Sequence, residues 1–162
     1  MSISTERGDR GKSYWNGREV DKDSPLLEAI GMIDELQSRL GLTKILVEGE
    51  DKSKFNQMEM DLYSIMGNLS CGQEWNDGEK RVLELKSEVE RMEADLPINR
   101  SFTIPGENEI EANINSCRTA CRTAERRVVT LNKEVELNEN VLKYFNRLSD
   151  VLYLMAIEQV KN

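Results

Sequence analysis

The fold is predicted most clearly by the stretch Cys117-Arg118-Thr119-Ala120-Cys121-Arg122-Thr123-Ala124-Glu125-Arg126-Arg127. Its apolar positions, Cys117, Cys121 and Ala124, recur at steps of four and three residues, the period of one face of an α-helix. The same pattern extends to Ile114 on one side and to Val128 and Leu131 on the other. The stretch therefore predicts an amphipathic helix over roughly residues 108–132.

Four further segments have the same periodicity. One begins with Ser24 as the N-cap and Pro25 in the first turn, and its apolar residues continue through Leu40. Two others cover roughly 52–70 and 78–95, with Asp77 as the expected cap of the second, and the last is capped by Asn138. We find no convincing strand pattern, so the prediction is an all-α, mainly antiparallel five-helix bundle. We expect this bundle to form a single domain over residues 24–162, preceded by the N-terminal segment 1–23.

Composition excludes several classes of function. The chain has 162 residues, a formal net charge of −8 and no histidine. The acidic balance disfavours nucleic acid as the main partner, and the lack of histidine rules out histidine general-base catalysis. No apolar run is long enough to cross a bilayer, and the N-terminus does not resemble a signal peptide, so we expect a cytoplasmic protein without membrane contact.

Three cysteines, at positions 71, 117 and 121, are expected to be reduced thiols. Cys117 and Cys121 are one helical turn apart and could in principle hold a metal ion. No suitable further ligands accompany them, so the favoured interpretation is a pair of small buried apolar residues and no metal site.

Charged residues share a face of the 108–132 helix. Arg118, Arg122 and Glu125 are spaced by four and three residues, and arginine can bind phosphate or carboxylate through two hydrogen bonds. The alternative is an ordinary solvated face with intrahelical pairs. On the last helix Asn146, Asp150 and Tyr153 also share a face.

The N-terminal segment Thr5-Glu6-Arg7-Gly8-Asp9-Arg10-Gly11-Lys12-Ser13 is the other candidate anion site. Two glycines three residues apart can form an amide-lined loop for phosphate, but the Walker A spacing is missing. A flexible tail is the alternative.

Taken together, these motifs resemble the PduO-type ATP:cob(I)alamin adenosyltransferases. The matching blocks occur in the family's order: Thr5…Gly8-Asp9-Arg10-Gly11, Lys22-Asp23, Glu28…Asp34-Glu35-Leu36…Gly41, Phe102…Pro105-Gly106, Arg118…Arg127 and Asn140…Asp150. The sequence departs from the family pattern at three notable positions. Glu6 stands where lysine is usual, Glu107 where a second glycine follows the proline, and Asn115 where histidine is usual.

The resemblance implies a five-helix subunit assembled as a homotrimer, with ATP bound between the N-terminal loop of one chain and the helices of another. The loop residues implied to hold ATP are Thr5, Gly8, Asp9, Gly11, Ser13 and Lys22, and the implied helix residues are Arg118, Glu125 and Asn146. Asp34 and Arg122 would form an ion pair across the interface. Phe102 would border the corrin and exclude the lower axial ligand of cobalt.

The implied reaction is the transfer of the 5′-deoxyadenosyl group of ATP to Co(I) of cobalamin, with release of triphosphate. Mg²⁺ bridging the phosphates would assist, a reductase would supply Co(I), and an adenosylcobalamin-dependent enzyme would accept the product. The alternative is a non-catalytic carrier or regulator that binds cobalamin or nucleotide on the same fold.

Overall fold

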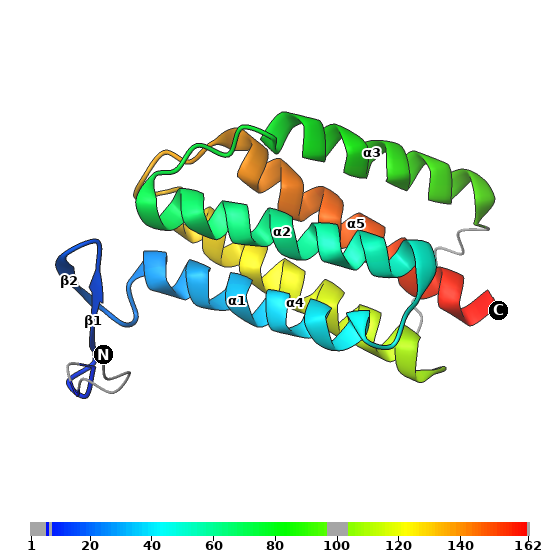
Figure 1. Cartoon of the computed structure of the whole chain (residues 1–162), viewed down its shortest axis with the longest axis horizontal. Helices are drawn as coiled ribbons and strands as arrows, with labels where there is room; N and C mark the ends of the chain where they lie inside the picture. The colour runs from blue at the N-terminus through cyan, green and yellow to red at the C-terminus, as the bar shows by residue number, and fades with distance from the viewer. Residues whose placement is uncertain (1–5, 7, 97–103, 162) are drawn as a thin grey trace.

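The computed structural model describes residues 6, 8–96 and 104–161. Five helices make up most of this part of the chain, and a short hairpin precedes them (Figure 1). The elements are β1 (Lys12–Trp15), β2 (Arg18–Asp21), α1 (Pro25–Lys44), α2 (Gly49–Cys71), α3 (Gly78–Asp95), α4 (Glu109–Leu131) and α5 (Glu139–Lys161). The predicted all-α bundle is therefore confirmed.

Polar side chains fix where the helices begin. Ser24 Oγ accepts a hydrogen bond from the Leu27 amide at 3.5 Å, and Asn108 Oδ1 accepts one from the Glu111 amide at 2.9 Å. Asn138 Oδ1 likewise accepts from the Asn140 amide at 2.9 Å before α5. Asp77 occupies the predicted cap position of α3 but makes no capping hydrogen bond through its side chain. Such caps satisfy amide groups that a helix end leaves without an intrahelical partner.

The helices run mainly antiparallel to their neighbours (Figure 1). α1 packs against α2 and α4, α4 packs against α5, and α5 packs against α3. Successive helices alternate in direction, so α3 and α5 form the parallel exception (Figure 1). This arrangement places one face of α4 and α5 beside α3, where the predicted arginine face lies.

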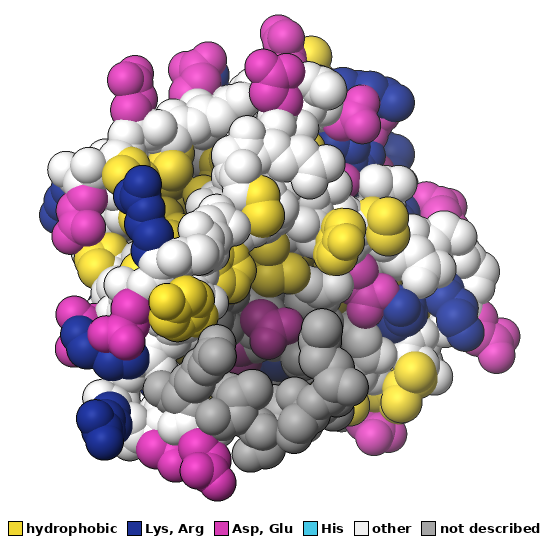
Figure 2. All heavy atoms as spheres, turned by 60° about the vertical axis from the view of Figure 1, so that its left-hand side comes forward, with side chains coloured by type: hydrophobic (Ala, Val, Ile, Leu, Met, Phe, Trp, Pro, Cys, Tyr) yellow, Lys and Arg dark blue, Asp and Glu magenta, His cyan; other side chains and the backbone are white. Residues whose placement is uncertain are grey.

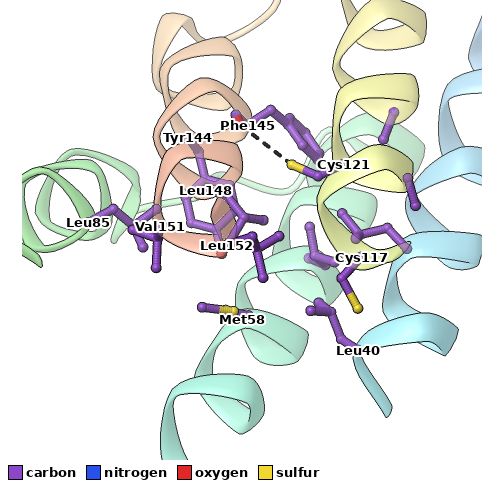
Figure 3. Close-up of a cluster of buried hydrophobic side chains, with 14 of the residues drawn as sticks. Leu40, Met58, Leu85, Cys117, Cys121, Tyr144, Phe145, Leu148, Val151 and Leu152 are labelled. Atoms are coloured by element: carbon purple, nitrogen blue, oxygen red, sulfur yellow. Dashed lines mark hydrogen bonds between the residues drawn. The ribbon is translucent and has the colours of Figure 1, made fainter. Parts of the chain in front are cut away.

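The core is formed by the apolar stripes that the sequence predicts. All six predicted inward positions of α4 are buried. The apolar stripe that the same periodicity predicts for α5 is also buried: Val141, Phe145, Leu148, Leu152 and Met155. Cys117 and Cys121 point in different directions between the helices (Figure 3), and Cys121 Sγ donates to the Phe145 carbonyl at 3.5 Å. Burial raises the pKa of the Cys117 thiol to about 11 and that of the Cys121 thiol further. Both cysteines therefore behave as small buried residues, as predicted.

A buried polar cluster joins α2, α3 and α5. Asp61, which is 3% exposed, accepts from Arg81 Nε at 2.9 and 3.0 Å and from Tyr144 Oη at 2.8 Å. Gln57 donates to the same carboxylate at 3.0 Å. A buried carboxylate needs such partners because leaving it unpaired costs several kcal/mol, on the order of 3–5.

The hairpin corrects the expectation that the chain contains no strand. β1 and β2 pair antiparallel with Ser13 opposite Val20, and Asn16 and Gly17 form the turn with φ of 47° and 76°. Positive φ at both turn residues is the geometry that Asn-Gly favours in a two-residue hairpin. Strands of four residues are too short to show alternation, so only the Asn16-Gly17 pair could have signalled them.

The hairpin is tied to the end of α2. Trp15 Nε1 donates to the Ser70 carbonyl at 2.9 Å, and Asn16 Nδ2 donates to the same oxygen. Ser70 lies in the last turn of α2, where carbonyls lack intrahelical partners. The N-terminal segment thus has a fixed attachment to the bundle. Within the described ranges, no helix combines the length and apolarity that a membrane span requires.

Candidate functional site

A pocket of about 480 Å³ opens between α3, α4 and α5. It is lined by Lys86, Val89, Glu90, Glu93, Arg118, Arg122, Arg147, Ser149, Asp150, Tyr153 and Leu154. Two of the predicted site residues, Arg118 and Arg122, therefore share one cavity, which we call the helix pocket.

Arg118 is the least compensated cation of the helix pocket. Its side chain is half-buried, and Nε donates to Asn115 Oδ1 at 3.0 Å. Its guanidinium forms no ion pair with any described residue. A partly desolvated guanidinium without a carboxylate partner favours binding of an anion that offers two oxygens.

Glu125 and Asn146 are brought together beside the helix pocket. Arg122 Nη1 lies 2.7 Å from Glu125 Oε2, and Asn146 Nδ2 donates to Glu125 Oε1 at 3.4 Å. Asn146 Oδ1 in turn accepts from Arg147. These contacts place Arg122, Glu125 and Asn146 beside one another and connect α4 to α5.

Asp150 is the acidic residue that α5 contributes to the same pocket, beside Glu90 and Glu93 of α3. Burial raises its pKa, against the opposing effect of Arg147, whose Nη1 lies 3.3 Å from Asp150 Oδ2, and of Arg122. A carboxylate that is partly desolvated in this way gives up its charge more readily than an exposed one. The pocket therefore combines cations with a carboxylate whose negative charge is disfavoured by burial.

A second pocket, of about 840 Å³, is formed by the N-terminal loop and the hairpin; we call it the loop pocket. It is lined by Glu6, Gly8, Arg10, Lys12, Ser13, Tyr14, Glu19 and Lys22. Gly8, Ser13 and Lys22, all predicted to hold ATP, thus lie around one cavity. Arg10 and Lys12 add cationic side chains that the resemblance did not single out.

The backbone of the loop brings Gly8 and Lys22 together. A Cβ at position 8 would lie 2.9 Å from Lys22 Nζ, so the lysine occupies space that a side chain would take. Gly11 has φ of 74°, its amide donates to the Gly8 carbonyl at 3.3 Å, and its carbonyl accepts from the Lys22 amide at 2.9 Å. Glycine adopts this φ without steric cost. Asp9 lies exposed within the same turn.

The two pockets are separate within one chain. No described residue lines both of them. The hairpin, whose residues help to line the loop pocket, lies beyond the start of α1 (Figure 1). Asp34 is exposed on α1 and forms no ion pair with a described residue, whereas Arg122 pairs with Glu125 of its own helix. One chain therefore does not unite the predicted site residues.

Charge on the exposed surface is mixed. On the face that brings the hairpin end forward, Lys and Arg side chains are scattered among Asp and Glu and form no broad basic area (Figure 2). Two predicted site residues, Thr5 and Phe102, lie outside the described residues.

The sequence patterns did not identify Glu111 as a buried residue, and they did not predict the hydrogen bonds that Asn115 makes. Glu111 is 3% exposed, and its carboxylate accepts from the amides of Gly106 at 2.7 Å and Glu107 at 3.1 Å. It also accepts from Asn115 Nδ2. The spacing of Glu111, Asn115 and Arg118 by four and three residues was visible, but an acid in the first turn of a helix is ordinarily a surface feature.

Comparisons with known proteins agree in family. The family model described as cobalamin adenosyltransferase matches residues 3–159. A corrinoid adenosyltransferase of Bacillus subtilis is 35% identical over 172 residues, covering 100% of this chain and 87% of that protein. The human corrinoid adenosyltransferase is 33% identical, covering 95% of this chain and 67% of that protein.

Solved structures show the same fold. A variant PduO-type ATP:corrinoid adenosyltransferase from Lactobacillus reuteri, complexed with cobalamin and ATP, superposes with a TM-score of 0.88 at 25% identity. The match covers 99% of this chain and 91% of that one. A second variant of that type from the same organism, complexed with ATP, gives a TM-score of 0.87 at 26% identity, covering 98% and 94%.

Proposed function

The chain belongs to the cobalamin adenosyltransferase family, and we propose that it transfers the 5′-deoxyadenosyl group of ATP to Co(I) of a corrinoid, releasing triphosphate. The corrinoid adenosyltransferases among its relatives are enzymes, and this chain is an alkyl-group transferase of the same kind. A non-catalytic carrier on the same fold is the alternative that the assay below also tests.

The observation that supports this proposal most is the environment of the Arg118 side chain. It is half-buried in the helix pocket, held through Nε, and without an ion-pair partner among the described residues. A triphosphate would supply the anionic oxygens that this guanidinium lacks. The neighbouring Glu125 and Asn146 offer an acceptor and an amide suited to the neutral, hydroxyl-bearing part of a nucleotide.

The reaction requires little acid–base chemistry from the protein. An electron pair on Co(I) forms the cobalt–carbon bond while the C5′–O bond breaks, and its electrons leave with the triphosphate. The protein contributes by holding the two substrates in line and by stabilising the leaving negative charge. Lys22 and Arg118 are the cations proposed for that second role, which fits a chain without histidine.

We propose that the complete site lies between subunits. The loop pocket of one chain would close over the helix pocket of another, in the homotrimer that the resemblance implies. Gly8, Asp9, Gly11 and Ser13 would then hold phosphate beside Lys22, with Thr5 joining them. Asp34 would pair with Arg122 of the neighbouring subunit, for which its exposure and lack of a described partner are suitable.

Further components complete the proposal. Mg²⁺ would arrive bound to the phosphates, and Glu6 and Glu19 are the carboxylates that line the loop pocket to contact it. Phe102 would border the corrin and keep the lower ligand off cobalt. A reductase that supplies Co(I), an acceptor enzyme for the product, and a cytoplasmic location stay predictions.

The direct test mixes the protein with ATP, Mg²⁺ and chemically reduced cobalamin and follows the visible spectrum. We expect the spectrum of an alkylated corrinoid to appear and triphosphate to be released in equal amount. Binding of cobalamin without product, together with no calorimetric binding of ATP, would favour the carrier instead.

Arg118→Ala should reduce kcat/KM for ATP about 10- to 100-fold, as expected for loss of one charge-assisted contact. The matched control is Arg126→Ala, because Arg126 lies exposed on the same helix and its guanidinium donates one hydrogen bond, to Thr123. Equal kinetics for the two variants would remove Arg118 from the site.

A further inference from the structure

A continuous hydrogen-bonded chain connects the turn after Pro105 to Arg118. The amides of Gly106 and Glu107 donate to Glu111 Oε2, and Asn115 Nδ2 donates to Glu111 Oε1. Asn115 Oδ1 then accepts from Arg118 Nε at 3.0 Å. Glu111 and Asn115 are both buried, at 3% and 8% exposed, so water competes little for these bonds.

The direction of every bond in this chain is fixed. A carboxylate can only accept, so Asn115 must present its Nδ2 to Glu111. Arg118 Nε can only donate, so Asn115 must present its Oδ1 to Arg118. The amide at position 115 therefore has one allowed orientation, set from both sides.

We propose that Glu111 and Asn115 are positioning residues for the transferase reaction, fixing the Arg118 guanidinium relative to the turn at Pro105–Glu107. This inference rests on the proposed function, in which Arg118 contacts the ATP phosphates. Holding Nε of Arg118 leaves its two terminal nitrogens as the groups that meet the phosphates. The same chain of hydrogen bonds connects Arg118, on the nucleotide side of the site, to the segment that follows Phe102 in the sequence.

The departure from the family pattern at position 115 agrees with this role. Histidine is usual there, whereas this chain has an amide. Asn115 is the residue that transmits the contact from Glu111 to Arg118. The chain thus has its own means of orienting this arginine.

The test reverses the direction of the bonds. In Glu111→Gln, the new side-chain NH₂ faces Asn115, whose amide must flip and then present its NH₂ to Arg118 Nε, another donor. We expect the dissociation constant for Mg·ATP, measured by calorimetry, to rise about tenfold, the usual effect of losing one hydrogen bond to a charged group. Asn115→Asp alone places two carboxylates together and should weaken binding similarly.

The double variant Glu111→Gln/Asn115→Asp restores a consistent direction along the whole chain. The glutamine NH₂ donates to one oxygen of the aspartate, whose other oxygen accepts from Arg118 Nε. We expect the dissociation constant to fall below that of either single variant, because the two substitutions are directly coupled, but to stay above the wild-type value, because Asp at position 115 offsets part of the Arg118 charge. If the double variant binds Mg·ATP no more tightly than the more weakly binding single variant, the proposal is overturned.

Two controls separate positioning from folding. Glu109→Gln removes the same charge from the same helical turn at an exposed position, and should leave the dissociation constant unchanged. Asn115→Ala removes the link while favouring the helix, so it should fold, and it should also raise the dissociation constant. A purely structural role would lower the melting temperature or the number of binding sites, but not the affinity of the sites that remain.

The proposed function and this inference fail in different ways. If the wild-type protein does not bind Mg·ATP, the proposed function is wrong. If the wild-type protein binds it and Arg118→Ala weakens it, while Glu111→Gln and Asn115→Ala do not, only the positioning role is wrong.

Discussion

Subunit complementation tests the inference that one active site combines two chains. The two pockets share no described lining residue, so a loop variant and a helix variant should damage different subunits of the same site. Lys22→Ala removes a cation from the loop pocket, and Arg118→Ala removes one from the helix pocket. Each should lower kcat/KM for ATP to roughly one tenth or less of the wild-type value, as for loss of a charge-assisted bond.

Mixing the two variants in one oligomer should then restore activity. A site is intact when its loop comes from an Arg118→Ala subunit and its helices come from a Lys22→Ala subunit. In a cyclic trimer that contains both variants, one site out of about three combines the intact loop with the intact helices, whichever variant is present twice. The geometry therefore predicts recovery of about one third of wild-type activity in the purified mixed trimers, clearly above either variant alone.

The assay co-expresses the two variants with different affinity tags and purifies oligomers that contain both. The rate of adenosylation is measured spectroscopically at an ATP concentration well below KM, so that the rate reports kcat/KM. Oligomers that carry both mutations in the same subunit, mixed with wild-type subunits, calibrate the random assembly. Mixed variants no more active than the average of the two pure variants would refute a site shared between subunits.

Three further results are expected. Tyr144→Phe should lower the free energy of unfolding by about 1.5–3 kcal/mol in a denaturant titration, because Asp61 loses one buried donor; no change would mean that Asp61 is satisfied without it. The hydrogen bond from Arg91 lowers the pKa of Glu88 to about 2, so the contribution of Glu88 to stability is present above its ordinary pKa and is lost as pH falls toward 2. Glu88→Gln should therefore reduce the fall in the free energy of unfolding at acid pH. An unchanged fall would contradict the assignment. Glu6→Lys should weaken binding of Mg·ATP about two- to fivefold in calorimetry, because the proposal places the Glu6 carboxylate against Mg²⁺ in the loop pocket; tighter binding of Mg·ATP would contradict that contact.

The bundle could be predicted from the sequence because its signal is local and repeated. Apolar residues at three- and four-residue steps form a stripe that can only be buried by packing against another helix. Cys117 and Cys121 illustrate this: their spacing alone predicted burial, and both are fully buried. The caps at Ser24 and Asn138 could be recognised for the same reason, since each depends on residues within a few positions.

The hairpin and the Glu111 chain could not be predicted because both depend on contacts distant in sequence or on backbone groups. Trp15 becomes an anchor only when the end of α2 presents the Ser70 carbonyl. Glu111 becomes buried only when the turn at Gly106 folds over it and offers two amides. Periodicity places Glu111 on a helix face but contains no information about the turn that covers it.

The contrast between Arg118 and three ion-paired arginines of the helices helps to explain how the site can be found in a strongly charged chain. Arg81, Arg91 and Arg122 each have a carboxylate partner within 2.9 Å, so their charge is already compensated. Arg118 is instead held by the neutral amide of Asn115, which orients the guanidinium without neutralising it. A carboxylate at that position would orient it equally well, but would compete with the incoming phosphate for the same charge. An amide that is itself held by a buried carboxylate therefore meets both requirements: it fixes the arginine and leaves its charge available to ATP.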